Sequence, residues 1–447
     1  METVVQLAAS LRKGKLDAVE LTESVLDSIA RCDDKAIFVD MLPERARAEA
    51  KAARKRLKAG EPASLVDGVP IGWKDLFDIK GRVTTAGSVV LKSNLPAAAD
   101  AALVQTGAKA GMVAVGTLNM TEFAFSGLGH NPHYGTPRNP HDVHVHCSPG
   151  GSSSASGVVV AKGLLPVAIG TDTGGSIRIP ASFNGVVGFK TSSGRYPMDG
   201  VFLLSRSFDT PGLLAQTVGD CVLVDAVLRG PKKVGAKKLD MKGCTFIVPT
   251  NVMFDGVEDA VNVNFESALS RISKLGGKIR RIAFPAFDAI LKLASTRGTI
   301  LGAEALHVHQ TRVNGPDAAR MDQRVVQRIK LAEKMTAVDL VEIMYQRQLL
   351  IRATTELIGD GIVVCPTTPH VAMAVAPLEA DMEEFFRVNA KTLRNTTLGN
   401  FLEWCGLSIP SGADRDGMPT GFLFSAPHGR DAEVLSVGLA LEAAVRG

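Results

Sequence analysis

Apolar residues recur at helical intervals in the first part of the chain. Between residues 5 and 29 they fall mostly on helical faces, and Gly14 interrupts the pattern, which predicts two short helices. The positions that carry this pattern are Leu7, Leu11, Leu21, Val25 and Ile29. Residues 43–59 are rich in Ala, Arg, Lys and Glu, and they predict a surface helix that ends at Gly60. We therefore expect a helical N-terminal layer.

From Val66 the pattern changes to short apolar runs separated by Gly, Pro, Asp and Asn, which favours strands that alternate with helices. These runs cover residues 69–73, 113–117, 158–160, 165–169 and 186–189. A predicted helix at 101–110 leads into the apolar residues 112–115, and this helix-to-strand step is the repeating unit of an α/β sheet protein. Nothing in the pattern requires the sheet to be wholly parallel.

The second half of the chain shows the same alternation of predicted strands and helices, after a polar segment. Residues 230–242 carry Pro, Gly and several lysines and predict an exposed connection. Beyond it we expect strands at 245–248, 278–282 and 361–365, a helix at 258–275 and a long charged helical region at 317–357.

Composition narrows the class of protein. The 447 residues are 45% hydrophobic, which suits a globular protein with a large core. The 50 Lys and Arg nearly balance the 46 Asp and Glu without a basic block, so we expect no direct nucleic-acid partner. Apolar stretches end well short of the roughly 20 residues of a membrane helix, and no signal peptide is evident. Six scattered cysteines without a CxxC pair suit reduced thiols, so the expected compartment is the cytoplasm.

A lysine ends one of the apolar runs. The segment Gly68–Asp75 reads GVPIGWKD, and Lys74 is its only cation. An exposed lysine at the end of a strand is the simplest interpretation. If Lys74 is instead forced into an apolar site, desolvation disfavours its charged form, and the neutral amine can act as a base near neutral pH.

Two Gly- and Ser-rich segments are hard to explain by folding alone. Residues 148–157 read SPGGSSSASG and lead into an apolar stretch, which is unusual for a flexible linker. The Lys-Ser/Thr ending of a P-loop is absent, so nucleotide binding is not indicated. Residues 170–180 read GTDTGGSIRIP, where two glycines directly precede Ser176. Such a turn can direct successive amide N–H groups at one point, as in an oxyanion hole, although it could equally be an ordinary strand-to-loop turn.

Together these segments resemble the amidase signature family. In that family, a lysine that ends a G-x-P-x-x-x-K-D run, the first serine of GGSS and the serine of a D-x-G-G-S-I-R turn form a Ser-Ser-Lys triad. The matching positions are Lys74, Ser152 and Ser176. Further segments that look like the family include LNMTEFA at 118–124, HYGTPRNP at 133–140, VCPTTP at 364–369 and DGMPTG at 416–421. The resemblance runs from about Leu7 to the end of the chain.

The resemblance implies a fold, a reaction and a set of site residues. The fold would be one α/β domain over residues 1–447, with a mixed sheet flanked by helices. Its parts would be a helical layer at 1–65, a signature core at 66–230 and a C-terminal part at 231–447. The reaction would be amide hydrolysis through a serine acyl-enzyme, without a cofactor. Backbone N–H groups of Thr173, Gly174, Gly175 and Ser176 would bind the oxyanion, with Asp172, Arg178 and Ser153 as supports and a cis peptide bond before Ser152.

This sequence also departs from the family pattern. The serine turn reads SSSAS, whereas the family more often has a glycine near Ala155. The residues just before this turn are His144, Val145, His146 and Cys147, in place of the more usual Pro or Arg. Five histidines, at 130, 133, 141, 144 and 146, lie in this region. Their irregular spacing lacks the arrangement of a metal site, so we expect no metal. A histidine acting as the base is the rival to Lys74.

Two other functions share the same signature. One is a subunit similar to the glutamine amidohydrolase component of a tRNA-dependent transamidase, which would need partner chains. The other is a non-catalytic binding module on an amidase scaffold, which the presence of all three triad residues disfavours. The expected partner is a small-molecule amide, and a homodimer is left open. The sequence leaves the substrate open among aryl, aliphatic and indole-acetamide amides and carboxylated ureas.

Overall fold

The computed structural model describes residues 1–142, 144–229, 236–237 and 239–447. Its centre is a mixed sheet of 11 strands, in the order β1-β3-β2-β4-β6-β5-β10-β11-β9-β7-β8. The strands are β1 Phe38–Met41, β2 Pro70–Lys74, β3 Val113–Leu118, β4 Val167–Asp172, β5 Val187–Lys190, β6 Thr210–Ala215, β7 Thr245–Pro249, β8 Lys278–Ile282, β9 Ile362–Pro366, β10 Cys405–Ala413 and β11 Pro419–Ala426.

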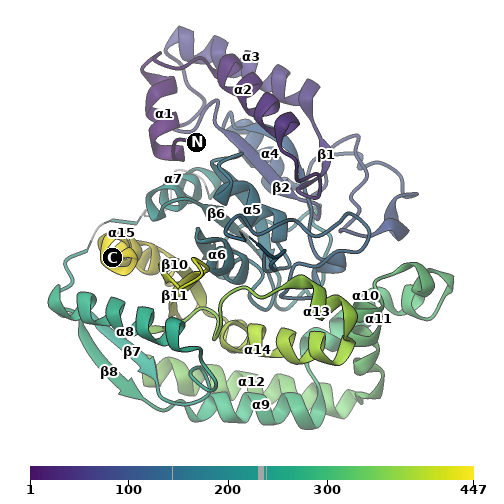
Figure 1. Ribbon diagram of the computed structural model, residues 1–447, viewed down its shortest axis with the longest axis vertical. Helices are drawn as coiled ribbons and strands as arrows, with labels where there is room; N and C mark the ends of the chain where they lie inside the picture. Colours follow the sequence, from purple (N-terminus) through teal and green to yellow (C-terminus); the bar gives the residue numbers. More distant parts are fainter. Residues whose placement is uncertain (143, 230–235, 238) are drawn as a thin grey trace.

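Helices pack around this sheet and lie beyond both of its ends (Figure 1). The helices are α1 Val4–Arg12, α2 Ala18–Arg31, α3 Pro43–Ala59, α4 Ala102–Lys109, α5 Ser154–Ala161, α6 Arg178–Asn184, α7 Val218–Leu228, α8 Asp259–Lys274, α9 Pro285–Arg297, α10 Ile300–Val313, α11 Gln323–Lys330, α12 Ala337–Ile358, α13 Val375–Ala380, α14 Met382–Phe401 and α15 Asp431–Arg446. Helices α1 to α3 lie at the top of Figure 1, whereas α9 and α12 lie at the bottom. The α/β class and the mixed sheet are as the sequence predicts.

Parallel strand pairs flank an antiparallel middle of the sheet, and β1 pairs with β3 in the antiparallel sense at one edge. Strand β2 runs parallel to both β3 and β4, and β7 runs parallel to β8 and β9. The middle of the sheet is antiparallel, through β4, β6, β5, β10, β11 and β9. Because β2 and β4 are parallel neighbours, their carboxyl ends lie at the same edge of the sheet. The residues that follow these two strands are therefore close in space.

Several predicted elements form where the sequence places them. The surface helix α3 ends at Gly60, which adopts a left-handed conformation with φ of 74°. Strand β8 covers 278–282, and α8 covers nearly all of the predicted helix at 258–275. The long helical region at 317–357 is divided, since α11 and α12 are separate helices.

The prediction of a strand at the apolar run 158–160 is wrong, because these residues belong to helix α5. Residues 154–160 of α5 are all buried, so an apolar face and a polar face cannot be told apart. Of the predicted connection at 230–242, residues 230–235 and 238 lie outside the described residues. The boundaries at 65 and 230 stay predictions, although the largest cluster of buried apolar side chains runs from Val4 to Val445.

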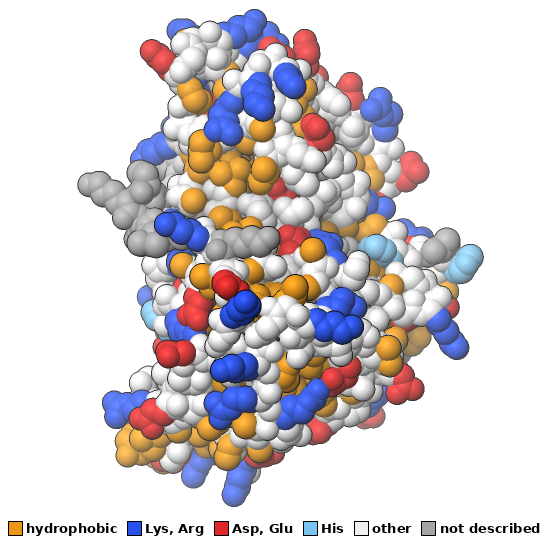
Figure 2. Space-filling model, turned by 90° about the vertical axis from the view of Figure 1, so that its left-hand side faces the viewer, with side chains coloured by type: hydrophobic (Ala, Val, Ile, Leu, Met, Phe, Trp, Pro, Cys, Tyr) orange, Lys and Arg blue, Asp and Glu red, His pale blue; other side chains and the backbone are white. Residues whose placement is uncertain are grey.

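Surface charge follows the balanced composition. On the face in Figure 2, Lys and Arg side chains are interspersed with Asp and Glu. No helix among the described residues combines the length and the apolar composition needed to cross a membrane.

The packing of α8 on the sheet gives a first prediction. Phe265 of α8 is 1% exposed, and its ring stacks on Phe422 of β11 at 4.9 Å between centroids. Replacing Phe265 with Ala would leave a cavity in this packed region. We expect the free energy of unfolding to fall by about 3–5 kcal/mol, measured by urea denaturation. Val263→Ala on the exposed face of the same helix is the control and should change it by less than about 0.5 kcal/mol. Equal losses in the two variants would contradict this packing.

Candidate active site

Three separate segments meet at the carboxyl end of the β2–β4 pair. Lys74 is the last residue of β2, and Thr171 and Asp172 end the neighbouring strand β4. Ser152 precedes α5, and Ser176 lies in the turn between β4 and α6. The parallel pairing of β2 with β4 therefore brings residues far apart in the sequence into one site.

Lys74 is fully buried, and its amine forms hydrogen bonds with two hydroxyl groups. Its Nζ lies 2.7 Å from Ser152 Oγ and 2.9 Å from Thr171 Oγ1. No carboxylate among the described residues forms an ion pair with it. Burial lowers the pKa of Lys74 to about 7, although the charges of Asp209 and Asp172 act in the opposite direction. A large fraction of Lys74 is therefore neutral at physiological pH and can accept a proton.

The loop before α5 holds Ser152 against β4. The peptide bond between Gly151 and Ser152 is cis. The Gly151 N–H donates to Gly127 O at 2.7 Å, and the Ser152 carbonyl accepts from Thr121 N at 3.1 Å. Ser153 Oγ lies 3.2 Å from the Thr171 carbonyl oxygen and 3.3 Å from the Thr171 N–H. Ser153 thus fixes the serine loop to the strand whose Thr171 also contacts Lys74.

The turn that carries Ser176 depends on glycine. Gly175 has φ of 134°, in the region that favours glycine, and a Cβ there would collide with Thr396 Oγ1. Thr396 and Thr397 of α14 both donate to the Gly174 carbonyl, at 2.7 and 3.2 Å. On its other side, the same peptide unit donates through Gly175 N–H to Asp172 Oδ1 at 2.9 Å. The orientation of the turn is therefore fixed from both sides.

These bonds distinguish the four N–H groups near Ser176. The Gly175 N–H is already used by Asp172. Within the described residues, no hydrogen bond takes up the N–H of Thr173, Gly174 or Ser176. Three donors around Ser176 are thus available to an oxygen atom of a ligand.

Asp172 and Arg178 form a buried ion pair beneath the turn. Arg178 Nη2 and Nε donate to the two carboxylate oxygens of Asp172 at 2.9 and 3.0 Å, and Asn400 Nδ2 donates at 2.9 Å. Burial alone would raise the pKa of Asp172, but the Arg178 charge and these hydrogen bonds hold it well below its usual range. The pair stays charged, and Asp172 also accepts from Ile177 N at 3.1 Å. Both residues lie behind the turn.

Asp209 is a partly buried carboxylate that the sequence analysis missed. Its Oδ1 accepts from Thr173 Oγ1 at 2.6 Å, and its Oδ2 accepts from the N–H groups of Leu204 and Ser205 at 2.8 and 3.1 Å. Burial raises the pKa of Asp209 to about 6. Its position directly before the apolar strand β6 was the only signal in the sequence. Its charge acts on Lys74 and favours protonation of the amine.

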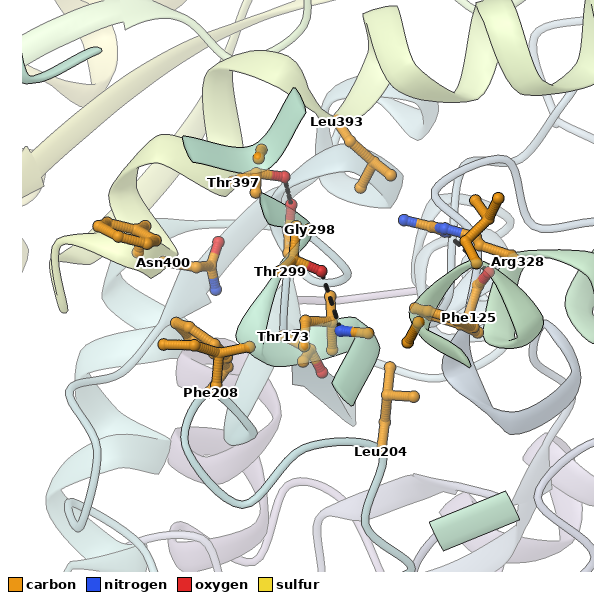
Figure 3. Close-up of a pocket in the computed structure, with 18 of the residues that line it drawn as sticks. Phe125, Thr173, Leu204, Phe208, Gly298, Thr299, Arg328, Leu393, Thr397 and Asn400 are labelled. Atoms are coloured by element: carbon orange, nitrogen blue, oxygen red, sulfur yellow. Dashed lines mark hydrogen bonds between the residues drawn. The ribbon is translucent and has the colours of Figure 1, made fainter. Parts of the chain in front are cut away.

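Ser176 opens onto a cavity of about 310 Å³. Thr173, Gly174 and Ser176 form part of its wall, and most of the remaining lining is apolar, including Leu204 and Phe208. Figure 3 shows Thr173 near the centre of this lining, between Phe208 and Asn400 on one side and Phe125 and Arg328 on the other. The cavity suits a small, largely apolar ligand beside the serine hydroxyl.

The histidines at 130–146 lie apart from this cavity. No histidine of the described chain belongs to its lining. His130 is buried against Phe385, and burial lowers its pKa to about 3, whereas His141 Nε2 lies 3.1 Å from the Asn184 carbonyl oxygen. Within the described ranges, no group of three or more His, Cys, Asp or Glu side chains could hold a metal ion.

Comparison with known proteins identifies the family of this chain. A model of the Amidase family matches residues 20–435. The chain is 31% identical to the 2-amino-5-chloromuconic acid deaminase of Comamonas testosteroni, over 99% of this chain and 96% of that protein. It is 30% identical to the mandelamide hydrolase of Pseudomonas putida, over 98% and 90%. It is also 31% identical to a glutamyl-tRNA(Gln) amidotransferase subunit from Acidothermus cellulolyticus, over 99% and 94%.

The fold has matching solved structures as well. The crystal structure of an amidase superposes with a TM-score of 0.87 at 27% identity, and the match covers 99% of this chain and 100% of that one. The similarity therefore extends over the whole architecture, including the N-terminal helical layer.

The ion pair beneath the turn gives a second prediction. Arg178→Met would leave the Asp172 charge buried without its main partner, and we expect the free energy of unfolding to fall by about 3–5 kcal/mol in urea denaturation. The double variant Asp172→Asn with Arg178→Met should lose less than the two single variants added together, because it leaves no unpaired charge. Arg387→Met, in an exposed ion pair with Glu384, is the control and should leave the midpoint nearly unchanged. Additive single losses would contradict the pairing.

Proposed function

This chain belongs to the amidase family and is an amide-hydrolysing enzyme, and from that premise we propose that it cleaves its substrate through a triad of Ser176, Ser152 and Lys74. The products would be a carboxylic acid and ammonia or an amine. The observation that carries the proposal is the buried Lys74. Its amine lies 2.7 Å from Ser152 Oγ, and its pKa is lowered by burial to about 7.

In the first half of the reaction, Ser176 Oγ attacks the amide carbonyl carbon. Its proton passes to Ser152, and the Ser152 proton passes to neutral Lys74. The negative charge that develops on the carbonyl oxygen is stabilised by backbone N–H groups of Thr173, Gly174, Gly175 and Ser176. Because the Gly175 N–H also donates to Asp172, the other three are the stronger candidates. Loss of one such donor costs on the order of 3 kcal/mol in other serine hydrolases.

In the second half, the tetrahedral intermediate collapses and the carbon–nitrogen bond breaks. Lys74 returns its proton through Ser152 to the departing nitrogen, which leaves as ammonia or an amine. Water then attacks the acyl-enzyme and transfers a proton along the same relay, which releases the acid and restores Ser176. Asp172, Arg178 and Ser153 take no proton in this scheme, and they hold the two serine loops in place.

A second candidate function is that of one component of an amidotransferase. Its support is the full-length similarity to a protein named as a glutamyl-tRNA(Gln) amidotransferase subunit. The two functions differ in their need for partner chains. Ammonia release from a panel of simple amides by the purified chain alone supports the hydrolase, whereas activity only with glutamine and partner chains supports the amidotransferase role. No ammonia under either condition would point to a non-catalytic module. The cytoplasmic location stays a prediction. The homodimer that the sequence leaves open is tested by the mass of the protein in solution.

The proton relay predicts how the triad variants behave. Ser176→Ala should abolish turnover, and Ser152→Ala and Lys74→Ala should each lower kcat by several orders of magnitude. Combining these two changes should cost little more, because both residues act in one relay. The control is Ser156→Ala, which changes a buried serine within α5, four positions after Ser152, and should leave kcat nearly unchanged. Near-normal activity of Lys74→Ala at neutral pH, measured by ammonia release, would refute the mechanism.

The pKa of Lys74 predicts the pH dependence. Only the neutral amine accepts the proton, so kcat/KM should rise through pH 7 to an alkaline plateau and fall as the pH drops below 7. Asp209→Asn removes a negative charge that favours protonated Lys74, so this variant should shift the limb to lower pH. Replacing each of the five histidines in turn should leave the limb in place. A limb that disappears with one histidine variant would transfer the role of base from Lys74 to that residue.

A further inference from the structure

The cavity beside Ser176 contains an arginine without a counter-charge. Arg328 of α11 is one of the residues that line it, and in Figure 3 its guanidinium reaches into the cavity next to Phe125. Its Nη1 donates to the Phe125 carbonyl oxygen at 2.8 Å, and the guanidinium lies 4.3 Å from the centre of the Phe125 ring. Within the described part of the chain, no carboxylate forms an ion pair with Arg328.

Neighbouring arginines are paired. Arg324, one turn earlier on the same helix, bonds to Asp322 at 2.8 Å. Arg178 below the serine turn has Asp172 as its partner. Burial lowers the pKa of Arg328 to about 10, so the guanidinium remains a cation at neutral pH. An unpaired cation in an apolar cavity is unfavourable, and an anion that enters the cavity would relieve this cost.

The remaining donors of Arg328 are suited to a carboxylate. A guanidinium has five N–H donors in a planar fork, and the hydrogen bond to Phe125 uses one of them. A carboxylate accepts two parallel hydrogen bonds from such a fork, and charge-assisted bonds of this kind are about twice as strong as neutral ones. The apolar wall of the cavity, with Leu204, Phe208 and Ile300, would contact a hydrocarbon segment between that acid group and the amide.

We propose that the substrate is an amide that also carries a carboxylate, and that Arg328 binds this acid group while Ser176 attacks the amide. The inference rests on the proposed function, because it assigns the substrate class of the same site. Arg328 is a specificity-determining residue in this scheme, since it contacts the substrate away from the reacting atoms and takes no proton.

Matched substrates test the proposal. Monoamides of dicarboxylic acids, from succinamic to suberamic acid, are compared with neutral alkyl amides of the same chain length by ammonia release. For the best acid length we expect kcat/KM to exceed that of the neutral amide by about 10–100-fold, the usual effect of a hydrogen bond to a charged group. Arg328→Met should remove this preference mainly by raising KM for the acids, so that acids and neutral amides of equal length are cleaved with similar kcat/KM. Arg328→Lys should keep part of the preference for the acid. Arg324→Met, in the neighbouring ion pair, should leave kcat/KM unchanged for both classes of substrate.

The outcomes separate this inference from the proposed function. If neutral amides are cleaved as well as the acids, or if Arg328→Met lowers both classes equally, Arg328 has a structural role and the inference is wrong, while the hydrolase mechanism stands. If no amide is cleaved, a binding experiment tests the acid site separately. Ser176→Ala protein is titrated calorimetrically with adipate, and binding that is lost in Ser176→Ala/Arg328→Met supports the acid site even though the mechanism has failed. Absence of adipate binding in Ser176→Ala overturns the acid site.

Discussion

The active site depends on keeping Lys74 away from both water and carboxylate contacts. The shift of its pKa from 10.5 to about 7 corresponds to a cost on the order of 5 kcal/mol for the charged form. Below pH 7 this cost reduces the free energy of unfolding in full. As the pH rises from 7 toward the pKa of an unfolded lysine, the reduction becomes progressively smaller. The hydroxyls of Ser152 and Thr171 satisfy the amine without fixing its charge. A carboxylate in their place would keep Lys74 protonated, and no base would remain for Ser176.

The turn that presents Ser176 is supported by charged groups that are paired, in contrast to Lys74. Asp172 and Arg178 are equally buried, but they contact each other and stay charged, so their geometry does not change with protonation. Through Asp172 and the threonines of α14, this pair fixes the peptide unit between Gly174 and Gly175. The acid–base group thus has no carboxylate partner and the supporting groups are paired. Arg328 in the cavity also has no carboxylate partner among the described residues.

Much of this arrangement could be predicted from local sequence, and the rest required contacts between distant segments. The glycines before Ser176 and the lysine that ends an apolar run are local signals, and so is Gly60 at the end of α3. The apolar run 158–160 gave no reliable signal, because helix α5 is buried on every side. Strands β10 and β11 were not predicted, and they pair with β5 and β9 from remote parts of the chain. Asp209 and Arg328 look like ordinary charged residues until the fold places them beside Lys74 and the cavity.

The central claim is that Lys74 is a neutral amine near physiological pH, and direct titration tests it best. Protein labelled with ¹³C at the lysine ε-carbon can be followed by NMR over pH 5–11, with Lys74→Met to assign the signal. The account predicts a lysine signal that titrates near pH 7 and is missing in the variant. Lys190, whose pKa burial lowers to about 8, should give a second shifted signal that remains. If the signal lost in Lys74→Met instead titrates near 10.4, as a solvated lysine does, Lys74 is an ammonium ion at neutral pH and cannot be the base.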